Sequence, residues 1–171
     1  VATYRNSEGG ADINACLTCD PGTKTNTTGT ITCDICPVGK YEVDNLICVD
    51  CEVGKYQDTQ QSDFCHLCPR GRVVNVEGSD ELDDCQFCTS GRVSNAEGET
   101  GCYDCLVGEY SNRTQYVDGG RLRAVDECAE CRVGTYYTGL GDVDKCELCD
   151  YGTYTNVTGE TLCAECSIGK F

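Results

Sequence analysis

The sequence predicts a small disulfide-rich all-β fold: an elongated tandem array of disulfide-closed β-hairpin modules, with no large core and no significant helix. Three observations support this class. Cysteine accounts for 18 of the 171 residues, a density typical of domains in which cross-links replace a core. Leu, Ile, Val and Phe together supply only 32 residues, too few to fill one core for a chain of this length. The cysteines also recur at regular intervals, which indicates a repeat architecture.

The repeat consists of nine Cys-x2-Cys pairs: Cys16/Cys19, Cys33/Cys36, Cys48/Cys51, Cys65/Cys68, Cys85/Cys88, Cys102/Cys105, Cys128/Cys131, Cys146/Cys149 and Cys163/Cys166. Between 11 and 22 residues separate consecutive pairs. This spacing divides the chain into a partial module at 1–15, eight complete modules and a partial module at 163–171. The complete modules are 16–32, 33–47, 48–64, 65–84, 85–101, 102–127, 128–145 and 146–162.

Each module carries the same local signals. A glycine stands three residues after the second cysteine of every pair, and an aromatic residue follows two positions later in most modules, as in Gly54 and Tyr56. Four modules then contain Asn-x-x-Gly, which favours a β-turn between two short strands. We therefore expect a bend at the glycine, a strand, a turn, and a return strand to the next cysteine. Residues 1–9 follow this pattern with Ala2 in the glycine position.

We expect the second cysteine of each pair to bond to the first cysteine of the next, so that each disulfide closes one hairpin. The alternative joins first to first and second to second cysteines of adjacent pairs. The expected bonds are Cys19–Cys33, Cys36–Cys48, Cys51–Cys65, Cys68–Cys85, Cys88–Cys102, Cys105–Cys128, Cys131–Cys146 and Cys149–Cys163. Cys16 and Cys166 remain for disulfides to another subunit or to a continuation of the array.

Cysteines at this density predict a secreted or cell-surface protein. Three Asn-x-Thr sequons, at Asn26, Asn112 and Asn156, predict N-linked glycans. Each lies seven residues after the second cysteine of a pair, so we expect all three at equivalent hairpin tips. A net charge of -16 disfavours nucleic-acid binding, and no apolar run approaches the roughly 20 residues that membrane insertion requires.

The sequence favours no enzyme and no cofactor. Zinc or metal-thiolate binding is opposed by the single histidine, His66, which we expect to be an exposed spacer, and by the hairpin signals between the pairs. The carboxylates at Asp80, Glu81, Asp83 and Asp84 are interpreted as a solvated loop rather than an acid-base pair. We expect the tyrosine rings to pack over their own disulfides and the next hairpin rather than to bind sugar.

Residues 16–166 resemble the ephrin-receptor-like cysteine-rich repeats and, more distantly, the first half of a tumour-necrosis-factor-receptor module. The motif Cys-Pro-x-Gly-x-Tyr is complete at Cys36-Pro37-Val38-Gly39-Lys40-Tyr41. The resemblance implies an extracellular, elongated array of β-hairpins. Asp126-Glu127-Cys128 is also similar to the start of a calcium-binding EGF-like module, so calcium at Asp126, Asp142 or Asp144 is an alternative.

These observations predict an extracellular structural repeat protein, a glycosylated rod whose copies assemble head-to-tail into a fibre, sheath or surface stalk. The alternative function is a ligand-binding or spacer segment of a receptor ectodomain.

Overall fold

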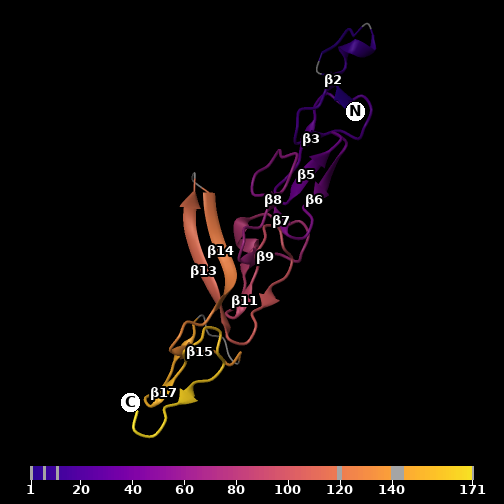
Figure 1. Cartoon of the computed structure of the whole chain (residues 1–171). Helices are drawn as coiled ribbons and strands as arrows, with labels where there is room; N and C mark the ends of the chain where they lie inside the picture. The colour runs from indigo at the N-terminus through magenta and orange to yellow at the C-terminus, as the bar shows by residue number, and fades with distance from the viewer. Residues whose placement is uncertain (1, 6, 11, 119–120, 140–144, 171) are drawn as a thin grey trace. The chain divides into compact units, whose positions relative to one another are not determined.

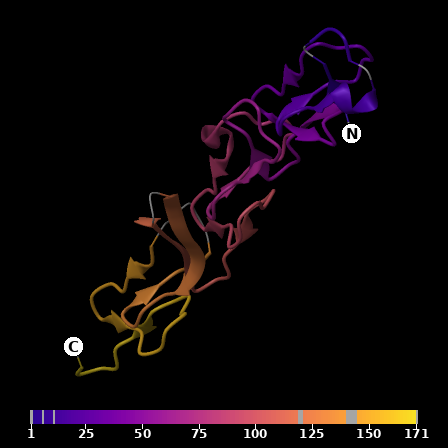
Figure 2. The ribbon, with the colours of Figure 1, turned by 90° about the horizontal axis from the view of Figure 1, so that it is seen from above.

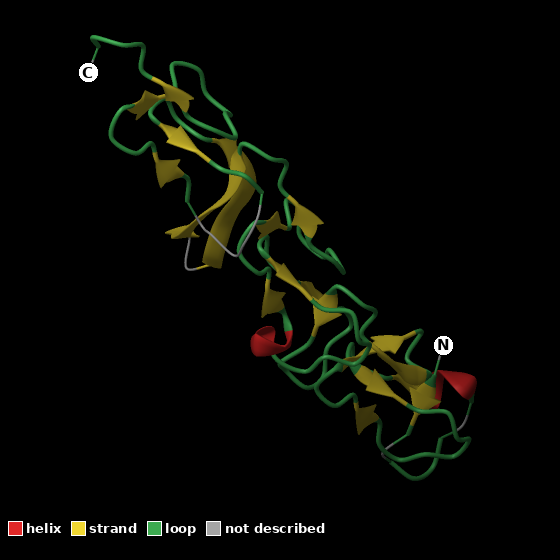
Figure 3. Ribbon diagram, turned by 90° about the horizontal axis from the view of Figure 1, so that it is seen from below, coloured by secondary structure: helices red, strands yellow, loops and turns green. Residues whose placement is uncertain are grey.

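The computed structural model describes the whole chain except residues 1, 6, 11, 119–120, 140–144 and 171. Within the described part, Figure 3 shows short strands joined by loops, with two 3₁₀ turns as the only helical elements. Neither turn is long or apolar enough to cross a membrane. The predicted all-β class is therefore confirmed.

The chain forms two compact units. One contains Val1–Cys68 and Val74–Gln86, and the other contains Pro69–Val73 and Phe87–Phe171. The strands pair into two-stranded sheets, each joining neighbours along the chain. The early elements are β1 (Thr3–Tyr4), η1 (Ile13–Ala15), β2 (Leu17–Thr18), β3 (Thr23–Lys24), β4 (Asp34–Ile35), β5 (Lys40–Val43), β6 (Ile47–Asp50), β7 (Lys55–Tyr56), β8 (His66–Leu67), β9 (Arg72–Val73), η2 (Leu82–Asp84) and β10 (Gln86–Phe87).

The later elements include one hairpin that is much longer than the rest. They are β11 (Arg92–Val93), β12 (Tyr103–Asp104), β13 (Glu109–Asp118), β14 (Arg121–Glu130), β15 (Thr135–Tyr136), β16 (Glu147–Leu148), β17 (Thr153–Tyr154) and β18 (Ala164–Glu165). Figures 1 and 2 show the β13–β14 hairpin as the longest ribbon of its unit, and β14 contacts β11 there.

Eight disulfides join the second cysteine of a pair to the first cysteine of the next, which is the connectivity expected from the spacing. They are Cys19–Cys33, Cys36–Cys48, Cys51–Cys65, Cys68–Cys85, Cys88–Cys102, Cys105–Cys128, Cys131–Cys146 and Cys149–Cys163. Each bond closes one hairpin loop.

The return strand of each hairpin differs from the expected one. In most modules it consists of the two residues between the cysteines of the next pair, such as Asp34 and Ile35, which pair with Lys24 and Thr23. The second cysteine of that pair then donates its backbone N–H to the glycine carbonyl of the preceding module, as in Cys51 to Gly39 at 2.8 Å. Cys19 donates to Ala2 in the same way at 3.4 Å, so the first residues adopt the module pattern with Ala2 in the glycine position.

Successive modules are joined by three recurring backbone hydrogen bonds. Between modules 48–64 and 65–84, the N–H groups of Gly54, Gln57 and Gly78 donate to the carbonyls of Val74, Ser79 and Cys51 at 2.8, 3.0 and 2.8 Å. Modules 128–145 and 146–162 repeat this set, with Gly134, Tyr137 and Gly159 donating to Thr155, Glu160 and Cys131. Module stacking therefore rests on the backbone.

The module glycine is required both by its conformation and by close packing. Gly108 has a φ of +81°, which favours glycine over residues with a side chain, and a Cβ atom there would lie 2.0 Å from the carbonyl oxygen of Gly159. Gly108 lies in module 102–127 and Gly159 lies two modules later, in module 146–162. The glycine therefore permits contact between modules that are not consecutive.

Apolar burial is limited, as the composition predicts. In the described residues the buried apolar positions are mainly cysteines, and one small cluster joins Cys68, Val74 and Cys85. Tyr56 packs against this cluster, which belongs to the module that follows its own. Tyr154 is 47% exposed, so the tyrosines are not uniformly buried over disulfides.

Candidate functional site

The module pattern changes at the root of the long hairpin in the C-terminal unit. Ser111 pairs with Cys128 in the register of β13 and β14, and the pairing continues to Asp118 and Arg121. The chain therefore runs on as a strand where other modules form the turn that supplies the stacking hydrogen bonds. In module 85–101, the backbone groups that would bind to that turn therefore need other partners.

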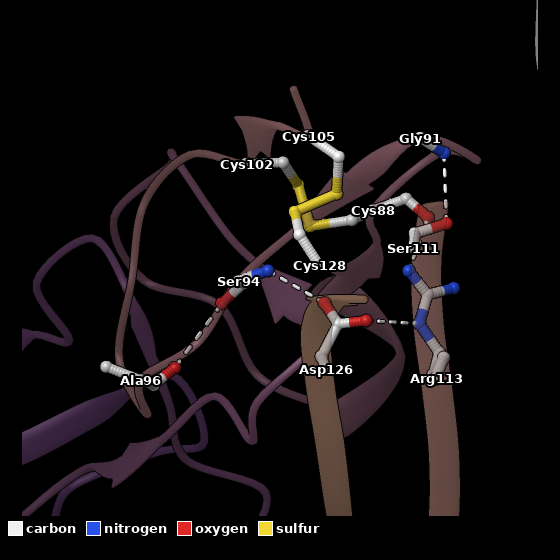
Figure 4. A network of polar contacts seen from close by, with 10 residues as sticks. All are labelled: Cys88, Gly91, Ser94, Ala96, Cys102, Cys105, Ser111, Arg113, Asp126 and Cys128. Atoms are coloured by element: carbon white, nitrogen blue, oxygen red, sulfur yellow. Dashed lines mark hydrogen bonds and ion pairs between the residues drawn. A yellow bond between two sulfur atoms is a disulfide. The ribbon is translucent and has the colours of Figure 1, made fainter. Parts of the chain in front are cut away.

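Three side chains supply those partners (Figure 4). The Gly91 N–H donates to Ser111 Oγ at 3.0 Å, and the Ser94 N–H donates to Asp126 Oδ2 at 2.7 Å. Arg113 Nη2 donates to the Cys88 carbonyl at 3.0 Å. These backbone groups occupy the positions of Gly54, Gln57 and Cys51 in the regular stack. Side chains of the long hairpin thus replace backbone groups and preserve the stacking of its module.

An ion pair connects two of these side chains. Arg113 Nε lies 3.0 Å from Asp126 Oδ1, and the Asp126 side chain is fully buried whereas that of Arg113 is 25% exposed. The Arg113 guanidinium also lies 5.5 Å from the centre of the Phe87 ring. Both Asp126 oxygens are therefore engaged, and a buried carboxylate with a cation and an N–H donor is satisfied without a metal.

The calcium alternative gains no support from this arrangement. No group of three or more His, Cys, Asp or Glu residues suited to a metal occurs within the described ranges. Asp126 instead binds Arg113 and Ser94, while Asp142 and Asp144 lie outside the described residues.

The shorter β5–β6 hairpin uses the same device in part. The Gly22 N–H lies 3.4 Å from Glu42 Oε2, and Asn45 Nδ2 donates to the Cys19 carbonyl at 3.2 Å. Strands of four residues again displace the usual turn. In both described hairpins whose strands are longer than two residues, side chains thus replace some of the backbone groups that stack the other modules.

The three sequons occupy two kinds of position. Asn26 and Asn156 are exposed and begin turns that end at Gly29 and Gly159, both with positive φ. Asn112 lies within β13 opposite Glu127, so the prediction of three equivalent hairpin tips is wrong for this residue. The spacing from the preceding cysteine is the same, but the 22 residues between pairs allow the strands to extend past it.

The remaining cysteines, Cys16 and Cys166, are unpaired and half-buried. The register of β1 and β2, with Thr3 opposite Thr18, matches that of Thr23 opposite Ile35 in the next hairpin. Cys16 therefore has the position that forms a disulfide in the following modules. Cys166 donates its N–H to the Gly152 carbonyl at 2.8 Å, as the other second cysteines do.

The acidic loop has a structural role. Asp84 Oδ2 accepts the backbone N–H groups of Asp80 and Glu81 at 2.8 and 3.2 Å, and so stabilises the start of η2. His66 is half-buried rather than an exposed spacer. Its ring centre lies 5.5 Å from that of Tyr56 and 5.0 Å from that of Phe64, because β8 pairs with β7 and aligns His66 with Tyr56.

A family model described as tyrosine-protein kinase ephrin type A/B receptor-like matches residues 41–85. This segment is therefore similar to an ephrin-receptor-like module. It contains the disulfides Cys51–Cys65 and Cys68–Cys85 and the contact of the partly buried Tyr56 with the small cluster. The ephrin-receptor-like match confirms the resemblance predicted from the motif and, with the eight disulfides, indicates a segment of extracellular, receptor-ectodomain-like type. None of the curated proteins matches the chain in sequence.

Sequence reasoning missed the network of Ser111, Arg113 and Asp126. The available signal was the 22-residue interval between Cys105 and Cys128, the longest in the chain. An interval that long predicts an extended hairpin, but it does not identify which side chains compensate at the root.

Proposed function

We propose that the chain is an extracellular structural repeat array without enzymatic activity, whose copies join head-to-tail through Cys16 and Cys166 into a fibre, sheath or surface stalk. The observation that supports this proposal is the disulfide ladder. Eight bonds of one connectivity use all the cysteines except Cys16 and Cys166. These two thiols occupy positions whose equivalents in the other modules form disulfides. In an oxidising compartment such thiols form disulfides.

The stacking mode also supports repetition. Each regular junction uses backbone donors and acceptors together with a glycine contact, so it places few demands on side-chain identity. Arrays held by nearest-neighbour contacts of this kind extend without changing the individual module. A further module, supplied by another copy, would meet the same groups at Cys166 and Gly169.

The proposal is tested by non-reducing peptide mapping of native material. The same mapping is applied to copies with light and heavy isotopes that are mixed under reducing conditions and reoxidised together. A bond between two copies then gives peptides of mixed mass. We expect a mixed Cys16–Cys166 peptide, and loss of large species in C16S. C16S/C166S controls for loss of both thiols. Two alkylated free thiols in unreduced native material would contradict head-to-tail joining.

The second candidate is a ligand-binding or spacer segment of a receptor ectodomain. The ephrin-receptor-like match at residues 41–85 favours it, as does a hairpin whose root is fixed by side chains while its strands extend well beyond the stacking contacts. This function predicts that Cys16 and Cys166 bond to cysteines outside residues 1–171 of the same polypeptide. The same peptide map distinguishes the two candidates.

A further inference from the structure

The β13–β14 hairpin contains more continuous strand than any other sheet that the structure describes. Its strands contain ten residues each, whereas the others contain two to four. A long strand at the edge of a sheet presents backbone N–H and C=O groups that can pair with another chain. Natural proteins block such edges with charges, bulges or covering groups, so this hairpin requires protection.

The two faces of the hairpin differ near its root. Successive residues of a strand lie on opposite faces, and the residues of the buried face, Ser111 and Asp126, are 4% and 2% exposed. Asn112 and its cross-strand partner Glu127 occupy the other face. Asn112 is half-buried there, while Thr114 and Glu127 are exposed.

We propose that an N-glycan on Asn112, on the outer face of the edge strand β13, blocks pairing of that strand with a second copy of the chain. The sequon Asn112-Arg113-Thr114 places its asparagine and threonine on the same face, because they are two residues apart on a strand. Arg113, between them, belongs to the opposite face and is held by Asp126. Asn112 and Thr114 thus lie on the outer face, while the ion pair of Arg113 and Asp126 fixes the root of the hairpin.

The inference rests on the proposed extracellular function, because attachment requires a secretory pathway. The donor is a lipid-pyrophosphate-linked oligosaccharide. The Asn112 side-chain nitrogen bonds to the anomeric carbon of the first sugar, the bond from that carbon to the pyrophosphate oxygen breaks, and the amide loses one proton as the lipid pyrophosphate leaves. No oxidant or reductant is needed.

The other sequons provide matched controls. Asn26 and Asn156 lie in exposed turns next to strands of only two residues, β3 and β17. Glycans there cover no long strand, so their removal is not expected to promote pairing. N26Q and N156Q therefore control for general loss of carbohydrate.

The test compares T114A with T114S in chains carrying C16S/C166S, secreted from a glycosylating host. Threonine and serine both complete a sequon and alanine does not. Intact mass gives occupancy, and sedimentation velocity gives self-association over a concentration series. We expect T114S, N26Q and N156Q to remain monomeric and T114A to shift to dimers or larger species. N112K, which replaces the glycan by a charge, should also remain monomeric.

Enzymatic trimming of the folded N26Q/N156Q chain to a single sugar keeps the test independent of folding defects, and it should cause the same shift as T114A. Monomeric T114A and monomeric trimmed protein would overturn the inference. Asn112 without glycan, with Asn26 and Asn156 occupied, would overturn it and leave the extracellular function intact. A chain with no glycan at any of the three would contradict both.

Discussion

Arg113 and Asp126 face each other directly across the β13–β14 hairpin, and their side chains form an ion pair of 3.0 Å at its root. Each also binds the backbone of the preceding module, Arg113 at the Cys88 carbonyl and Asp126 at the Ser94 N–H. One cross-strand pair thereby fixes a long hairpin to a stack whose regular junctions use backbone hydrogen bonds. The hairpin can lengthen without interrupting the array.

Replacing Asp126 by alanine should destabilise the C-terminal unit by about 3 kcal/mol, because it leaves Arg113 and the Ser94 N–H without their buried partner. Urea denaturation with the disulfides intact measures the change. The control is D104A, which removes the exposed ion pair between Arg92 and Asp104 and should change stability by less than about 1 kcal/mol. Equal effects of the two variants would contradict the assigned role of Asp126.

Ser111→Ala should accelerate exchange of the Gly91 amide hydrogen, since Ser111 Oγ is its acceptor at 3.0 Å. Loss of one such hydrogen bond corresponds to about 1 kcal/mol, or roughly fivefold in local opening. Amide exchange followed by NMR measures this directly. S111T keeps a hydroxyl and should retain most of the protection, whereas unchanged protection in S111A would show that the bond does not hold the strand.

Gly108→Ala and Gly152→Ala separate the two requirements on the module glycine. Both residues have a φ of +81°, but an added Cβ meets the Gly159 carbonyl at 2.0 Å only in the first case and meets nothing within 4 Å in the second. Gly152→Ala should destabilise by about 1 kcal/mol through its backbone conformation. Gly108→Ala should exceed about 4 kcal/mol or prevent correct oxidation. Thermal unfolding and the yield of the eight-disulfide form are the measurements, and similar losses would exclude the packing explanation.

The hydrogen bond from Tyr136 to Glu147, its cross-strand neighbour, raises the pKa of the Tyr136 phenol above its usual value of 10.0. The folded state therefore favours the protonated phenol. The stabilisation is fully present below the pKa of the unfolded chain and is lost as the pH rises through the higher folded pKa. Ultraviolet titration of tyrosinate in wild type and E147Q measures this. The pKa should fall in E147Q, and an unchanged titration would show that Glu147 is not the cause.

The return strands of the hairpins were not predicted, because they lie between the cysteines of the next pair. The all-β class, the cysteine repeat and the preferred disulfide connectivity could be predicted from the sequence. These features are local, because each bond spans 12 to 23 residues and the Asn-x-x-Gly turns and module glycines define the chain reversal between its cysteines. The register even placed Ala2 correctly in the glycine position. Because this local geometry repeats along the chain, few of these features depend on contacts between residues that are far apart in the sequence.

The way in which the irregular module fits the array depends on tertiary contacts. Ser111, Asp126 and Arg113 reach partners 20, 32 and 25 residues away in the sequence, and no local pattern identifies such pairs. The sequence likewise predicted a turn at Asn112, but the residue lies in a strand, because cross-strand pairing extends over ten residues. Turn chemistry is encoded by neighbouring residues, whereas replacement of a missing backbone acceptor depends on which side chains the folded chain brings to it.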